Sequence, residues 1–152
     1  MKDIVDLAVQ KQTVVITGAS AGVGRAVARA FARRGWRVAL VARGVSRLEA
    51  TAREVRHLGG EAMVLPADVA DAQAVEAVAD QVTTQWGHID LWINNAMVTV
   101  FGPVSAITAD EFRRVTEVTY LGQVNGTQSA LRQMSKTGQG TIVCIGSALA
   151  YR

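Results

Sequence analysis

The spacing of apolar residues changes repeatedly along the chain, and this alternation limits the folds that it can adopt. Residues 13–17 form a short, largely apolar run, which is typical of a strand buried on both faces. The next apolar residues recur at the spacing of one helix face: Val23, Ala26, Val27, Ala30 and Phe31. Strand patterns and helix patterns alternate in this way along the whole chain. This alternation implies right-handed crossovers and a mostly parallel α/β sheet covered by helices on both faces.

The remaining elements follow from the same signals. Further strands are predicted at residues 38–42, 62–65, 89–93 and 141–145. Capping boxes at Ser46 and Thr108 predict helices that run to about residues 58 and 134, and Asp71 can cap another helix. The apolar stripe of that third helix is Val75, Val78, Ala79, Val82 and Trp86.

The turn between the first strand and the first helix carries three glycines, in the sequence Thr-Gly-Ala-Ser-Ala-Gly-Val-Gly at residues 17–24. Glycine lets a backbone turn sharply and approach a ligand closely. The helix start that follows offers unpaired N–H groups and a positive dipole end, which suit a pyrophosphate. We therefore expect nucleotide binding by this loop, through Gly18, Ser20, Ala21, Gly22, Val23 and Gly24.

Composition and charge favour a globular, cytoplasmic protein. The 152 residues are 49% hydrophobic, and we expect one domain over residues 1–152 with an N-terminal tail at 1–11. No apolar run has membrane-spanning length, so no membrane partner is expected. The net charge is +3, but Arg25, Arg29 and Arg33 share one helix face, which favours a solvated surface over a nucleic-acid partner. The histidines lack metal-ligand spacing, and Cys144 is expected in the core.

The glycine loop resembles the cofactor loop of the short-chain dehydrogenase/reductase family. Three further segments resemble that family in the right order. Asp68-Val69 resembles its acid-apolar pair after the third strand, and residues 86–96 resemble its G-x-[IV]-D-x-L-[VI]-N-N-A strand. Residues 140–147 are similar to its G-x-I-V-x-x-x-S strand. The resemblance extends over nearly the whole chain.

The resemblance implies a Rossmann-type doubly wound parallel sheet in strand order 3-2-1-4-5, with the cofactor at the carboxyl ends of strands one and four. It implies hydride transfer between a nicotinamide and a small carbonyl or alcohol substrate, in a homo-oligomer. Asp68 and Val69 would hold the adenine, and the backbone at Asn95 and Ala96 would run under the ribose. Asn94 is expected to have a structural role.

The end of the second strand indicates which nicotinamide cofactor is bound. Enzymes that use NAD commonly place an acid there, but this chain has Ala42 followed by Arg43. Arginine can pair with a 2′-phosphate, Ser20 could add a hydroxyl, and the next carboxylate is Glu49. We expect NADP, with NAD as the alternative.

Two residues depart from the family pattern. Met97 stands where the family has glycine, so cofactor fit or substrate shape is expected to differ. Thr119 stands at the asparagine of the family's proton relay; it has a hydroxyl but no amide, so the relay would need a water or another route.

Ser147 resembles the family's serine that polarises the substrate carbonyl. The family's catalytic tyrosine and lysine form a Tyr-x-x-x-Lys motif about a dozen residues further on. The 152 residues do not contain this motif, and Tyr151 is too close to Ser147 to be that tyrosine. The sequence is therefore interpreted as the cofactor-binding portion of such an oxidoreductase, incomplete at its C-terminal side.

Two other functions stay open at this point. The chain could be a nucleotide-binding module without catalysis, or a subunit completed by another polypeptide. It could also be a basic nucleic-acid binder that reuses the fold. The fifth strand is expected to be an exposed sheet edge, and such edges favour pairing with another chain.

Overall fold

A computed structural model describes residues 11–147, and its strands form one parallel sheet in the order β3-β2-β1-β4-β5. The strands are β1 (Thr13–Thr17), β2 (Arg37–Ala42), β3 (Glu61–Pro66), β4 (Leu91–Asn94) and β5 (Thr141–Cys144). The predicted α/β class and strand order are confirmed. Most of the expected N-terminal tail and Tyr151 lie outside the described residues.

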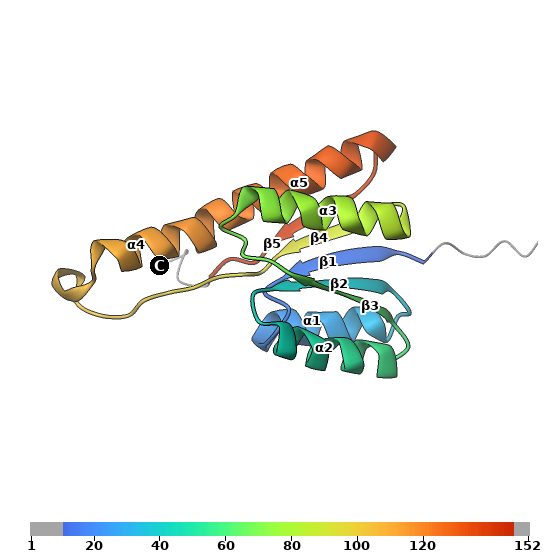
Figure 1. Cartoon of the computed structure of the whole chain (residues 1–152), viewed down its shortest axis with the longest axis horizontal. Coiled ribbons are helices and arrows are strands. Elements are labelled where there is room, and N and C mark those ends of the chain that lie inside the picture. Colours follow the sequence, from blue (N-terminus) through green and yellow to red (C-terminus); the bar gives the residue numbers. More distant parts are fainter. Residues whose placement is uncertain (1–10, 148–152) are drawn as a thin grey trace, which may run out of the picture.

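The helices cover the sheet on both faces, with α1 and α2 on one side and α3 and α5 on the other (Figure 1). They are α1 (Gly22–Ala32), α2 (Val45–His57), α3 (Ala72–Trp86), α4 (Ala109–Val115) and α5 (Gly122–Thr137), with a short 3₁₀ turn, η1 (Val104–Ala106). Successive residues of β1 enter opposite halves of the core: Val14 and Ile16 pack with α1 and α2, and Val15 packs with α3. This explains why the first strand reads as a continuous apolar run.

The helix face predicted for α1 is wrong in part. Its buried residues are Gly24, Ala28 and Ala32, whereas Val23 is 58% exposed. Small side chains let the helix axis approach the sheet closely, so the face with the least apolar volume is the one that is buried. Val27 and Phe31 only border the core on that side.

Two of the three predicted helix caps are confirmed. The Asp71 carboxylate accepts hydrogen bonds from the backbone N–H groups of Gln73 and Ala74 at the start of α3. Thr108 and Glu111 form the predicted capping box of α4. The box at Ser46 is wrong, because α2 already begins at Val45 and no side chain in the described structure caps it.

The long helix predicted from residue 108 is confirmed, but its middle is wound differently. The segment η2 (Thr116–Leu121) is a π-helix that joins α4 to α5 without a break. π-helical turns inside α-helices occur frequently at functional sites. In Figure 1, α4 extends beyond the sheet at the end where the strands finish.

Strand β5 is an edge of the sheet, as predicted, and pairs only with β4 among the described strands. Its position makes the prediction for Cys144 wrong: the thiol is exposed rather than in the core. Val143 is likewise exposed, because α1 and α2 pack against the other half of the sheet. Among the described residues, no helix combines the length and apolar character needed to cross a membrane.

Candidate nucleotide-binding site

A cleft of about 850 Å³ lies at the carboxyl ends of the strands, between the loops that follow them. The strand order reverses between β1 and β4, and ligands of such sheets bind at this point. All of the predicted cofactor residues except Gly24 line the cleft: Gly18, Ser20, Ala21, Gly22, Val23, Arg43, Asp68, Val69, Asn95 and Ala96. A smaller cavity of about 380 Å³ lies on the surface of α1 and α2, away from the strand ends.

The glycine loop is fixed by close packing against the end of β4. Gly18 has φ +68°, and a Cβ there would lie 2.8 Å from Asn95 Nδ2 and 2.9 Å from Ala96 Cα. Gly24 has a different role from the predicted ligand contact: its Cβ would lie 2.4 Å from the Gly18 carbonyl oxygen. Both glycines are therefore required by the closeness of neighbouring backbone.

The start of α1 presents backbone donors to the cleft. Ala21 is the N-cap residue and has no side chain that could accept a hydrogen bond, and the first turn contains no acid. Residues 20–23 line the cleft, so the first N–H groups of the helix lie at its wall. An uncapped N-terminus of this kind suits an anion such as a pyrophosphate.

Thr17 and Asn95 join the glycine loop to β4. The Thr17 hydroxyl donates to Ile93 O at 3.3 Å and accepts from the N–H groups of Asn95 and Ala96 at 2.9 and 3.0 Å. The Asn95 amide donates to the carbonyl oxygens of Thr17 and Gly18 at 2.9 and 3.3 Å. The Asn95 side chain thus holds the glycine loop, a role that was not predicted from the sequence. The only signal in the sequence was the hydroxyl of Thr17, at the end of the buried strand β1.

Asn94 has the structural role expected for it. It is 1% exposed, and its Oδ1 accepts a 2.9 Å bond from Trp92 Nε1. Its Nδ2 donates to Gln123 O at 3.3 Å and to Thr127 Oγ1 at 3.1 Å. This side chain ties β4 to α5 beneath the cleft.

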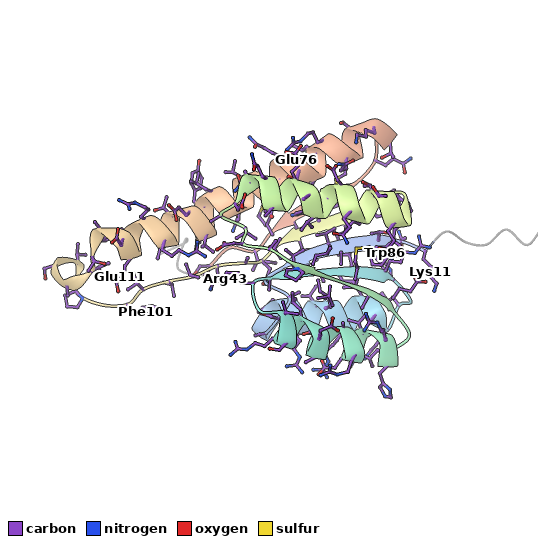
Figure 2. All side chains as sticks on the ribbon, viewed as in Figure 1. Lys11, Arg43, Glu76, Trp86, Phe101 and Glu111 are labelled. Carbon is purple, nitrogen blue, oxygen red and sulfur yellow. The ribbon has the colours of Figure 1, made fainter. Side chains whose placement is uncertain are left out.

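The charged residues of the cleft are mostly arginines. Arg43 and Arg47 line it from the end of β2 and the start of α2, and Arg114 lines it from α4. Figure 2 shows Arg43 toward the end of the molecule from which α4 extends, with Trp86 and Lys11 at the opposite end. Asp68 is the only acid among the described residues that line the cleft, and sequence reasoning did not foresee that Arg47 and Arg114 would join it.

Asp68 is held by two donors after β3. Ala70 N donates to Oδ1 at 3.1 Å, and Arg114 Nη2 donates to Oδ2 at 2.6 Å. Burial alone would raise the pKa of the carboxyl, but these hydrogen bonds and the charges of Arg114 and Arg43 outweigh it, so the pKa lies below its usual value. Asp68 is therefore a charged acceptor at neutral pH.

The neighbouring Val69 is fixed by α5. Asn125 Nδ2 donates to Val69 O at 2.9 Å. A Cβ at Gly122 would lie 2.6 Å from Val69 Cγ2, so the helix can pack against this residue only because it has glycine there. Val69 is buried and lines the cleft as an apolar wall.

Thr119 contacts the backbone that follows β4 and does not line the cleft. Its hydroxyl donates to Val98 O at 2.7 Å and accepts from Val98 N at 3.1 Å. This pair of bonds holds the strip that carries Met97, whose side chain is 51% exposed and lines the cleft. Thr119 thus supports the strip rather than facing a ligand.

Ser147 follows residues of the cleft in sequence but is not one of the residues that line it. Ile145 and Gly146 line it after β5, and Ser147, the last described residue, follows them and is exposed. The described residues contain no group of three or more side chains that could hold a metal ion.

The parallel sheet, the uncapped helix start and the basic cleft at the strand switch define a Rossmann-type α/β protein. The chain belongs to the short-chain dehydrogenase family, whose model matches residues 12–151. An uncharacterized oxidoreductase of Bacillus subtilis, YxnA, is 32% identical over 142 residues, which cover 93% of this chain and 40% of that protein.

Solved structures show the same likeness. An alcohol dehydrogenase of the archaeon Thermococcus sibiricus, complexed with 5-hydroxy-NADP, has 35% identity and a TM-score of 0.87, with 93% of this chain and 60% of that chain covered. An NAD⁺-bound xylitol dehydrogenase has 31% identity and a TM-score of 0.89, with coverage of 93% and 55%. The chain therefore spans less than two thirds of the length of these relatives.

Proposed function

We propose that this chain is the NADP-binding portion of a short-chain oxidoreductase that acts on a carbonyl or alcohol substrate. The uncapped N-terminus of α1 at the wall of the large cleft carries the proposal, because it supplies donors for a pyrophosphate. Gly18, Gly22, Ser20, Ala21 and Val23 would form this phosphate site. Gly24 contributes by letting the loop approach α1.

The adenosine end would lie between β2 and β3. Arg43 follows Ala42 where an NAD enzyme commonly has an acid, and Arg47 adds a second cation four residues later, in the first turn of α2. Ser20 lines the same cleft and could donate to a 2′-phosphate. Asp68 is the single acid among the described residues that line the cleft, and it is already paired with Arg114, so the cleft favours an anionic ligand and NADP over NAD.

Chemistry at the other end of the cofactor would involve the residues after β4 and β5. When bound, the nicotinamide would supply or accept the hydride. Asn95 and Ala96 line the cleft and would border the ribose. Ser147, which follows the cleft residues Ile145 and Gly146, would donate a hydrogen bond to the substrate carbonyl oxygen. Thr119 supports the strip under the cofactor, so we assign it no proton-transfer role.

A second candidate is a nucleotide-binding subunit that another polypeptide completes. The exposed strand β5 favours it, because an unpaired strand edge is a template for a further strand. We propose a homo-oligomer in either case, since the long helix exposes the apolar side chains of Phe112, Tyr120 and Leu131. We also propose a cytoplasmic location. Analytical ultracentrifugation measures the assembly.

Calorimetric titration of the 152-residue chain with NADPH and NADH tests the proposal. NADPH should bind more tightly, and Arg43→Ala should remove most of the difference, since losing one charge-assisted contact costs on the order of 1.5–3 kcal/mol. Arg53→Ala is the matched control, because Arg53 is exposed on α2 outside this cleft. Equal affinities for the two dinucleotides in the unmutated chain would contradict the assignment of NADP.

A further inference from the structure

Arg114 connects two parts of the cleft that are distant in sequence. It lies in the last turn of α4, and its Nη2 reaches Asp68 Oδ2, in the loop after β3, at 2.6 Å. The two side chains are 35% and 33% exposed, and both line the cleft. The pair therefore spans the cleft between the β3 loop and the helix that extends beyond the sheet (Figure 1).

The neighbouring arginine shows that this contact is not a general property of α4. Arg113 pairs with Asp110 three residues earlier in the same helix, and these side chains are 66% and 88% exposed. Exposed pairs of this kind contribute little, because water screens them. Arg114 instead bonds to the carboxylate of Asp68, in the loop after β3, and so restricts the orientation of that carboxylate.

The two donors leave Asp68 with acceptor capacity. Ala70 N occupies one site on Oδ1 and Arg114 one site on Oδ2, whereas a carboxylate has about four lone-pair sites. A donor on a ligand can still bind either oxygen. The bonds from both sides fix the plane of the carboxylate before any ligand arrives, which reduces the ordering cost of binding.

We infer that Arg114 is a positioning residue for the adenine end of the dinucleotide. It holds Asp68 so that the carboxylate accepts a hydrogen bond from the 6-amino group of the base. A base with a 6-oxo group offers no donor at that atom and places an acceptor against a carboxylate. This inference rests on the proposed function. It makes the preference for the 6-amino group depend on Arg114, whose side chain bonds only to Asp68 in the described structure.

The test compares NADPH with its hypoxanthine analogue, in which an oxo group replaces the 6-amino group of the base and N1 carries a proton. The unmutated 152-residue chain should bind NADPH about tenfold more tightly, as expected for one charge-assisted hydrogen bond. Arg114→Gln should reduce this ratio to about twofold or less. Arg114→Lys should retain part of it, because an ammonium can still donate to Asp68 Oδ2, and Arg113→Gln should leave it unchanged.

The ratio of the two affinities distinguishes the positioning of Asp68 from a general structural effect, since partial unfolding would weaken the binding of both dinucleotides equally. An unchanged ratio in Arg114→Gln would overturn the inference and leave the proposed function intact. Equal binding of the two dinucleotides by the unmutated chain would also overturn it, because Asp68 would then not read the base. Failure of the unmutated chain to bind either ligand would overturn the proposed function itself. Circular dichroism checks folding, and Arg114→Lys supplies the ratio if Arg114→Gln does not fold.

Discussion

Replacing Gly24 by alanine has two opposite effects on the stability of the fold: a gain in helix propensity and a loss from steric overlap. Alanine is the better helix former, and in an exposed helix this change would stabilise by about 0.5–1 kcal/mol. In α1, however, the new Cβ would lie 2.4 Å from the Gly18 carbonyl oxygen and 2.6 Å from Asn95 Nδ2. Overpacking of this kind costs typically about 1–3 kcal/mol.

The steric effect should win, because the nearest atom belongs to the backbone and cannot rotate away. Subtracting the helix-forming gain of about 0.5–1 kcal/mol from this cost leaves a net loss of up to about 2.5 kcal/mol, which would lower Tm by up to about 5–10 °C at about 2–4 °C per kcal/mol for a chain of this size. Affinity for NADPH should fall as well, since relieving the clash requires a shift of the glycine loop or of the start of α1, and both line the cleft. Differential scanning fluorimetry and calorimetric titration measure the two quantities.

Gly102→Ala is the matched control for Gly24→Ala. A Cβ at Gly102 would meet its nearest neighbour, Ile107 Cγ1, at 3.9 Å, which is ordinary contact. Both stability and binding should stay close to those of the unmutated chain. A Gly24→Ala variant with raised Tm and unchanged affinity would refute the argument that the loop has no room to move.

Three further outcomes are expected. Asn94→Ala should lower the free energy of unfolding in urea by on the order of 1–3 kcal/mol, because the buried Trp92 Nε1–H loses its acceptor; an unchanged midpoint would contradict this. The pKa of Asp68 is lowered in the fold, so its stabilisation is complete above the unfolded value of about 3.9 and is lost as pH falls through the folded value. The stability difference between the unmutated chain and Asp68→Asn should therefore shrink below about pH 4, and a constant difference would refute it. Finally, the purified 152 residues should bind NADPH yet oxidise it with carbonyl substrates at least ~10²-fold slower than a complete relative, since they contain no Tyr-x-x-x-Lys; robust turnover would show that another group donates the proton.

Signals confined to a few neighbouring residues were sufficient for much of the fold. The apolar run of β1, the Asp71 cap and the box at Thr108 each depend on bonds or contacts within one element, so the residue order determines them directly. The glycine loop was also readable, because a strand, three glycines and a helix follow one another in the chain. The strand order was predicted from the family resemblance and confirmed.

Only the tertiary structure decided the features that join distant segments. The buried face of α1 follows from how closely the helix approaches the sheet, which favours Ala28 and Ala32 over the larger Val23. The edge position of β5 was predicted, but the apolar neighbours of Cys144 favoured a buried side chain, and only the structure shows that this residue is exposed. Arg114 meets Asp68 across 46 positions of sequence, and no local pattern distinguishes it from Arg113. Such contacts depend on where whole elements pack, so the sequence indicates the chemistry available and packing determines which groups meet.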